Sequence, residues 1–301
     1  MKNKNLLSVF LAILVTVLWS TSFIIIKFGL EEIPPLLYAG LRYFIAFLCF
    51  LPIILKQKYI AEIKQLSKND WWELVLLGVV FYTLTQGMQF LGLSYLPAVL
   101  VSLILNFTPL IVALLGIGLL KEAPRFNQWM GIIFFILGIL IYFLPVKVTE
   151  KEIVGIIIML FGTVFNAVSA LLGRHINKKG KISTIVITAI SMGIGSIIML
   201  TIGLSFYNMP SLSLNTLVLL LWLAVINTAV AFTIWNYTLK HLNAVESSII
   251  NGTMLIQIGA LAWIMLGEEI TVKESIGMLI AAIGAVLVQL KFNKNFYTLK
   301  K

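Results

Sequence analysis

Two basic side chains lie inside long apolar stretches of the sequence and are the first candidates for chemistry. Lys27 is near the end of the stretch that begins at Leu6, and Arg42 lies within the next one. A charge at the centre of a bilayer costs roughly 2.5–3.5 kcal/mol, so such residues are candidates for function. Arg42 can clamp a carboxylate, or it can pair with an acid or a backbone carbonyl. Lys27 can face a ligand or a gate, or it can snorkel to the membrane surface.

The acidic residues are confined to loops and to the ends of apolar stretches. Glu122 and Glu268 each end such a stretch, where we expect helix-end contacts rather than proton transfer. Glu246 follows Asn243 by three residues, which is the spacing of a capping box at the start of a helix. Two histidines fall in predicted loops, His175 and His241. The sequence therefore predicts no buried acidic relay for protons.

The sequence contains no pattern typical of catalysis. We find no His/Asp metal spacing, no nucleophile motif and no cluster of ionisable groups at a membrane interface. We therefore expect no enzymatic activity, no metal and no cofactor. The single cysteine, Cys49, lies in an apolar run, so no disulfide framework is predicted.

Uncharged polar residues are more numerous within the apolar stretches, and each can serve helix packing or ligand contact. They are Ser20, Ser22, Gln86, Gln89, Asn106, Thr108, Asn166, Ser169, Asn227, Asn236, Asn251, Thr253 and Gln257. Trp19 and Trp235 can supply stacking walls beside them. The candidate binding residues are therefore Trp19, Ser22, Lys27, Arg42, Gln86, Gln89, Asn106, Asn166, Trp235, Asn236 and Asn251.

Composition identifies the class of protein to which these residues belong. Of the 301 residues, 60% are hydrophobic and 11% are charged, against roughly 45–50% and 25% in a soluble domain. These charged residues are too few to cover the surface of a soluble protein of this size. We therefore expect an all-α integral membrane protein that is surrounded by lipid. The net charge of +10 then indicates basic cytoplasmic loops rather than nucleic-acid binding.

Cutting the chain at charges, prolines and polar clusters gives ten segments near the ~20 residues of a spanning helix. Two uncharged stretches, 74–120 and 182–239, are too long for one helix and are divided at Pro97 and Pro210. The expected spans are 6–28, 36–55, 72–93, 98–120, 127–144, 153–173, 183–206, 215–238, 244–266 and 275–291. The first is too long for a signal-peptide core, so we expect a retained helix.

The distribution of Lys and Arg predicts the orientation. With a cytoplasmic N-terminus, 17 of the 22 basic residues fall on the cytoplasmic side. Only Lys147, Lys151 and Lys273 fall on the outer side. This asymmetry favours ten spans, with both termini cytoplasmic, in the cytoplasmic membrane.

A shift of 146 residues aligns the second half of the chain with the first. Ten identities occur in 43 ungapped positions, and the most specific is the pair Glu122 and Glu268. The expected repeats are 1–146 and 147–301, each of five helices. Because five is odd, the second copy is inverted in the membrane, an arrangement typical of secondary transporters. Gly131, Gly138, Gly277 and Gly284 lie seven apart in each copy and predict a packing seam, or else a dimer contact.

The sequence resembles the EamA-type permeases of the drug/metabolite transporter superfamily. The resemblance rests on residues 19–23 with Lys27, Arg42-Tyr43, residues 92–98, Pro109 with Glu122, Ala244, and Gly267-Glu268. It implies a solute carrier whose central cavity is lined by helices 1, 3, 4, 6, 8 and 9. The second copy departs from the pattern, because Leu255 stands opposite Pro109 and Phe165 opposite Trp19.

We therefore expect a secondary transporter for a small organic solute, such as an amino acid or a related metabolite. It would work by alternating access, by exchange or facilitated transport, as a monomer or homodimer. The alternatives are a channel, a membrane protein that transports nothing and, with less support, a membrane-embedded enzyme. The sequence does not distinguish export from uptake.

Overall fold

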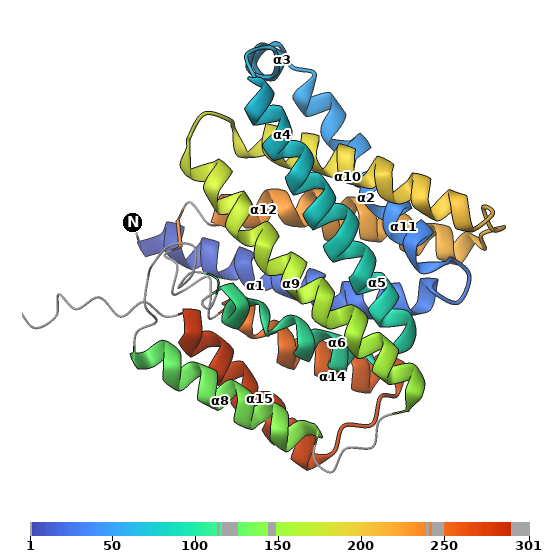
Figure 1. Ribbon diagram of the computed structural model, residues 1–301, viewed down its shortest axis with the longest axis vertical. Helices are drawn as coiled ribbons and strands as arrows, with labels where there is room; N and C mark the ends of the chain where they lie inside the picture. The colour runs from blue at the N-terminus through green and yellow to red at the C-terminus, as the bar shows by residue number, and fades with distance from the viewer. Residues whose placement is uncertain are drawn as a thin grey trace, which may run out of the picture.

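The computed structural model describes residues 2–112, 115, 126–143, 149–238, 241–242 and 250–289, and only the backbone at 2–5, 127–128, 143, 236 and 288–289. Every regular element in these ranges is helical (Figure 1). The elements are α1 (Lys2–Gly29), α2 (Pro35–Ile54), α3 (Gln57–Lys64), α4 (Lys68–Leu77), η1 (Gly78–Thr85), α5 (Gln86–Tyr95), α6 (Ala98–Leu105), α8 (Phe126–Phe143), α9 (Glu150–Lys178), α10 (Thr184–Phe206), α11 (Leu214–Ala224), η2 (Val225–Val230), α12 (Ala231–Thr238), α14 (Met254–Leu266) and α15 (Val272–Gln289).

Six helical stretches are long and apolar enough to cross a membrane. They are Leu6–Gly29, Pro35–Ile54, Lys68–Tyr95, Glu150–Lys178, Thr184–Phe206 and Leu214–Trp235. Shorter apolar helices occupy Ala98–Val112, Trp129–Tyr142 and Ile250–Leu266. The chain is therefore a multi-pass membrane protein, as its composition predicted. The count of ten spans and the side on which the termini lie stay predictions.

Polar caps place several helix ends outside the apolar segments. Ser67 and Asp70 form a capping box, so α4 begins at Lys68 rather than at the predicted residue 72. Thr149 and Glu152 do the same for α9, which begins at Glu150. Each box satisfies backbone N–H groups that a helix start leaves free, so the helix extends into the polar region.

Two further departures concern segments that were predicted to be loops. Helix α9 continues to Lys178, so His175 is helical rather than part of a loop. The short helix α3 occupies residues 57–64, between the second and third long apolar helices, Pro35–Ile54 and Lys68–Tyr95. His241 lies in a turn after α12, in agreement with the prediction.

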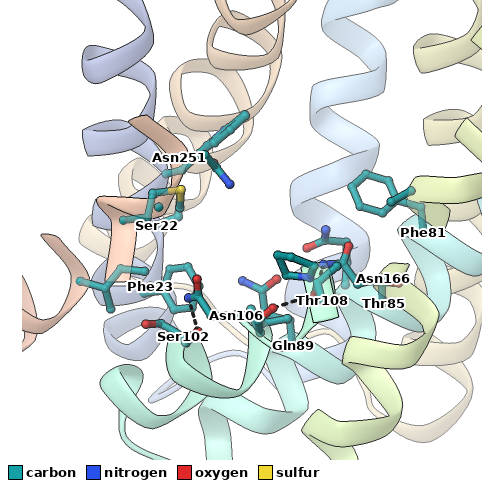
Figure 2. A pocket seen from close by; sticks show the side chains of 18 of the residues that line it. Ser22, Phe23, Phe81, Thr85, Gln89, Ser102, Asn106, Thr108, Asn166 and Asn251 are labelled. Carbon is teal, nitrogen blue, oxygen red and sulfur yellow. Dashed lines mark hydrogen bonds between the residues drawn. The ribbon is translucent and has the colours of Figure 1, made fainter. Parts of the chain in front are cut away.

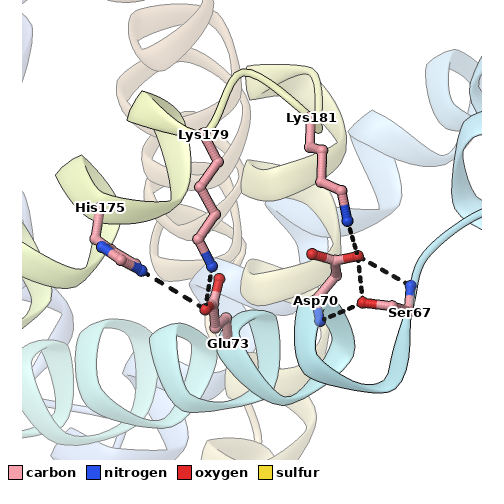
Figure 3. Close-up of polar contacts among 6 residues, drawn as sticks. All are labelled: Ser67, Asp70, Glu73, His175, Lys179 and Lys181. Carbon is pink, nitrogen blue, oxygen red and sulfur yellow. Dashed lines mark hydrogen bonds and ion pairs between the residues drawn. The ribbon is translucent and has the colours of Figure 1, made fainter.

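Polar contacts join α4 to the end of α9 and to the turn that follows it (Figure 3). Glu73 forms an ion pair with Lys179, and its Oε1 also lies 3.7 Å from Nε2 of His175. Lys181 Nζ lies 3.3 Å from Asp70 Oδ2, the carboxylate that also caps α4. These pairs are partly exposed, so they fix the register of two helix ends more than they add stability.

The glycine-rich faces allow close helix pairs. Helices α8 and α15 lie side by side at the bottom of Figure 1, next to α14. A Cβ atom on Gly277 would lie 2.7 Å from the Gly138 carbonyl oxygen and 2.8 Å from the Tyr142 backbone nitrogen. The predicted seam is thus formed within one chain. Helices α2 and α10 form a second close pair, in which a Cβ on Gly40 would lie 2.8 Å from Leu200 Cα.

Two spanning helices contain a wide, π-helical segment at related positions. Segment η1 interrupts the helix from Lys68 to Tyr95, and η2 interrupts the helix that begins at Leu214. The helices that contain these segments begin at equivalent positions, because their N-caps, Ser67 of α4 and Ser213 of α11, are 146 residues apart. The centres of η1 and η2 are also 146 residues apart. π-helical turns are rare and often occur at functional sites, so η1 and η2 indicate a candidate functional site in the region between them.

Candidate functional site

A cavity of about 630 Å³ lies where both halves of the chain meet. Helices α1, α2, α5, α6, α9, α12 and α14 contribute to its wall, together with η1. Figure 2 shows Ser22, Phe23 and Asn251 on one side of the cavity and Phe81 and Thr85 on the other. The volume suits a small organic ligand, for which cavities of roughly 300–1,000 Å³ are usual.

The first interruption beside the cavity separates α6 from the helical turn at residues 108–112. Helix α6 ends at Leu105, and the Asn106 side-chain amide donates to the Ser102 carbonyl at 2.8 Å. Pro109 has no N–H for the Leu105 carbonyl. The Thr108 hydroxyl donates to that carbonyl instead, at 2.7 Å. The helix is therefore interrupted just before Pro109, and the side chains of Asn106 and Thr108 bond to carbonyls at the interruption.

A second interruption occurs at Thr253, 146 residues after Phe107. The Thr253 N–H donates to the Ile250 carbonyl at 3.1 Å, and its hydroxyl donates to the same oxygen at 2.7 Å. Helix α14 then begins at Met254. No proline is needed here, because the threonine hydroxyl competes for the backbone carbonyl. Interrupted helices beside a cavity are typical of substrate sites in secondary transporters.

Arg42 is the one charged residue among the described residues that line the cavity. Its Nε donates to the Thr228 hydroxyl at 2.9 Å, and one Nη lies 3.4 Å from the Ser22 hydroxyl. Its guanidinium carbon lies 5.2 Å from the Tyr43 ring centre. Only 4% of the residue is exposed, and no ion pair joins it to an acid among the described residues. The neighbours thus orient Arg42 but leave its charge without a counter-ion in this part of the chain.

The π-helical segments position the residues around Arg42. The Thr228 hydroxyl donates to the Leu223 carbonyl five residues earlier, at 2.8 Å, which leaves its oxygen free to accept from Arg42. Thr85 bonds in the same way to Val80, also five residues earlier and at 2.8 Å. The wide turns therefore present these two threonines toward the centre of the bundle.

The comparisons with known proteins agree with this architecture. Residues 6–144 and 153–290 each match the sequence profile of the EamA-like transporter family. The chain belongs to the EamA-like transporter family. An uncharacterized transporter of Archaeoglobus fulgidus is 26% identical over 286 residues, which cover 92% of this chain and 96% of the relative.

Two further EamA relatives and one solved structure extend the comparison. The uncharacterized transporter YoaV of Bacillus subtilis is 27% identical, over 93% of this chain and 96% of its own length. A probable amino-acid metabolite efflux pump of Salmonella typhimurium is 28% identical, over 93% and 91%. A crystal structure matches with a TM-score of 0.68 at 14% identity, covering 93% of this chain and 96% of that one, and shows the shared fold alone.

Most of the candidate binding residues of this EamA chain surround the cavity. Those that line it are Trp19, Ser22, Arg42, Gln86, Gln89, Asn106, Asn166 and Asn251. Trp235 stands behind them, with its ring 5.2 Å from that of Trp19. Lys27 lies apart from the cavity, in a second pocket with Glu268. The side chain of Asn236 lies outside the described residues, as do Glu122, Asn243, Ala244 and Glu246.

Several polar residues bind neighbouring helices instead of facing the cavity. The Asn227 amide donates to the Leu18 carbonyl at 2.6 Å and to the Ser22 hydroxyl at 2.9 Å. Gln257 accepts from Ser20 at 2.9 Å and donates to Thr253 at 2.8 Å. These bonds fix α1 against η2 and α14, so the helix-packing interpretation applies to Asn227 and Gln257.

Some lining residues were not among the sequence candidates. Tyr43, Thr85 and Ser102 face the cavity, and the Tyr43 hydroxyl donates to the Gln86 amide oxygen at 2.7 Å. The Ser102 hydroxyl oxygen is buried and has no hydrogen-bond partner among the described residues. Ser102 aligns with an identical residue, Ser248, at the shift of 146 residues. This identity was the sequence signal by which Ser102 could have been chosen as a candidate. Thr85 faces the cavity through the π-helical turn, which carries no sequence signal of its own.

Proposed function

We propose that this chain is a secondary transporter that carries a small carboxylate-bearing solute, an amino acid or a related metabolite, by alternating access across the cytoplasmic membrane. The observation that supports it best is Arg42, a charged residue that is only 4% exposed and lies on the wall of a cavity beside two interrupted helices. Burial of a charge without a partner is unfavourable, and a bound carboxylate would relieve that cost.

The other wall residues suit an organic solute. Trp19, Phe23 and Phe232 provide aromatic surface, and the rings of Trp19 and Phe232 lie 5.4 Å apart. Gln89 and Asn251 also line the cavity and provide side-chain amides. Apolar walls with few polar groups are typical of small-molecule sites. Two relatives named probable amino-acid metabolite efflux pumps, at 23% and 28% identity, support the amino-acid class.

The transport mechanism rests on a ten-helix arrangement of two inverted repeats, 1–146 and 147–301, with both termini cytoplasmic. The recurrence of π-helical segments and interruptions at an offset of 146 residues supports this arrangement. Reporter fusions placed in successive loops test it. Alternating cytoplasmic and external signals over ten spans are expected, and any other sequence of signals would contradict it.

A counterflow assay with a panel of labelled metabolites tests the function. Purified protein in liposomes should exchange at least one carboxylate-bearing metabolite. Arg42→Gln and Asn106→Ala should reduce exchange without reducing expression, since both residues line the cavity. Lys27→Gln and Trp235→Leu should alter substrate affinity less, because neither residue lines it. If folded protein exchanges no member of the panel, the proposal is wrong. If no variant changes exchange, the site is wrong.

A further inference from the structure

Glu268 joins two segments from opposite halves of the chain at one end of the bundle. Its Oε1 accepts from the Ala98 N–H at 2.6 Å, and its Oε2 accepts from the Val99 N–H at 3.2 Å. Ala98 and Val99 begin α6, whose first N–H groups have no partner within the helix. A carboxylate there gains two charge-assisted bonds and the positive end of the helix dipole.

The end of α14 aims Glu268 at this position. Gly267 ends the helix with φ +66°, a left-handed conformation that favours glycine. The Glu268 N–H then donates to the Ala262 carbonyl at 3.2 Å, which folds the chain back toward α6. Lys27 from α1 lies in the same pocket as Glu268 and adds a positive charge beside it. The contact is therefore built from three elements: α1, α6 and α14.

This contact lies at the end of the interface between α6 and α14, which separates two cavities. The pocket containing Lys27 and Glu268 and the central cavity have no lining residue in common. Ala98–Ile104 of α6 is buried throughout, and α6 packs against α14, whose Ile258 and Ala262 are also buried. The central cavity is thus closed on the Glu268 side by the pairing of α6 with α14.

Both helices of this interface, α6 and α14, are short helical segments that are bounded by an interruption. Helix α6 runs from Pro97 to the break at Asn106, and α14 runs from the break at Thr253 to Gly267. Each piece therefore has the Glu268 contact at one end and an interruption beside the cavity at the other. An interruption can absorb a change of backbone angle, so the two pieces can separate without unfolding.

We infer that Glu268 is a positioning residue for transport, a latch that holds α6 to α14 while the cavity is closed on this side and that must release for it to open. The inference rests on the proposed carrier function, because only a carrier must open on both sides. In the predicted orientation the latch lies at the outer face of the membrane.

Thiol labelling from each side of the membrane tests the latch without any substrate. Cys49 is replaced by serine, and Ser102→Cys serves as the reporter inside the cavity. A membrane-impermeant maleimide is applied to intact cells and to inverted vesicles. Glu268→Gln replaces one accepting carboxylate oxygen by an NH2 group, which donates and cannot accept from a backbone N–H. Labelling from the Glu268 side should rise about tenfold, the ratio for one lost bond of about 1.4 kcal/mol, and labelling from the other side should fall.

Glu269→Gln is the matched control, because it removes the same charge from the neighbouring exposed residue and should leave both labelling rates unchanged. Glu268→Asp keeps the charge on a shorter side chain and should give an intermediate rate. It also serves if Glu268→Gln does not fold. Equal labelling of folded Glu268 and Glu269 variants from both sides would overturn the latch. Transport with unaltered labelling contradicts the latch alone, whereas altered labelling without any transport contradicts the proposed function alone.

Discussion

Replacing Arg42 by glutamine should remove the preference of the cavity for a carboxylate over the matching carboxamide. Arg42 is only 4% exposed, and its guanidinium is bound by the neutral hydroxyls of Thr228 and Ser22. Its five N–H donors exceed those two contacts, so donors remain for a ligand. Removing one partner of a desolvated, hydrogen-bonded charge pair costs about 2–5 kcal/mol. Even 2 kcal/mol corresponds to about thirtyfold in affinity.

The assay is competition in counterflow between an exchanged acid and its carboxamide. The parent protein should bind the acid at least about thirtyfold more tightly. Arg42→Gln should reduce that ratio to near one by weakening acid binding. Arg42→Lys keeps the charge but loses the planar fork, so an intermediate ratio is expected. Arg174→Gln, an exposed position on α9, is the charge-matched control and should behave like the parent.

The comparison of acid with amide separates recognition from folding. If Arg42 only supports the structure, Arg42→Gln will weaken acid and amide by the same factor. A parent protein that does not distinguish acid from amide, or an Arg42→Gln variant that keeps the preference, would refute the reasoning.

Three further predictions concern stability. Gly277→Leu should lower the Tm through overpacking of about 1–3 kcal/mol against Gly138 and Tyr142, whereas Leu279→Ala, at an exposed position of the same helix, should not; equal Tm values would contradict the close packing of α8 and α15. Gln257→Leu should lower the Tm because it removes bonds to Ser20 and Thr253, without changing the acid-to-amide ratio, and a changed ratio would place Gln257 in the binding site. The Ser213 backbone N–H and hydroxyl hold the pKa of Glu32 below its usual 4.5, so Glu32 stabilises the fold above that pH and the effect is lost as the pH falls through the lowered value. Glu32→Gln should therefore reduce the Tm at pH 7 but not at strongly acidic pH, and a pH-independent difference would contradict this.

The class of protein could be predicted from the sequence because membrane insertion depends on local apolar length. Within the described residues these segments are helical apart from the interruptions near Asn106 and at Thr253, and the predicted boundaries differ where polar residues extend a helix. Ser67 and Thr149 each begin a capping box outside the apolar core, so α4 and α9 start earlier than hydropathy indicates. The three-residue spacing of each capping pair is visible in the sequence, but the boundaries were predicted from hydropathy and charge alone.

The π-helical segments and the second interruption could not be predicted in this way. Segment η1 packs against α10, where a Cβ on Gly78 would lie 2.6 Å from the Ser191 carbonyl oxygen, and such a fit depends on contacts distant in the sequence. The break at Thr253 occurs without proline, so no residue type marked it. Likewise, nothing local distinguishes Asn227, which binds α1, from Asn106, which lines the cavity. Only the three-dimensional arrangement separates packing amides from binding amides.

The central claim is that the chain is a carrier with one central site, and counterflow in liposomes tests it most directly. Liposomes are loaded with an excess of unlabelled substrate, and the same labelled substrate is added outside. A carrier predicts that label accumulates transiently above its equilibrium level, that the initial rate saturates with concentration, and that Arg42→Gln raises the half-saturating concentration about thirtyfold. Label that only equilibrates, at a rate linear in concentration and unaffected by Arg42→Gln, would contradict the account and indicate a channel.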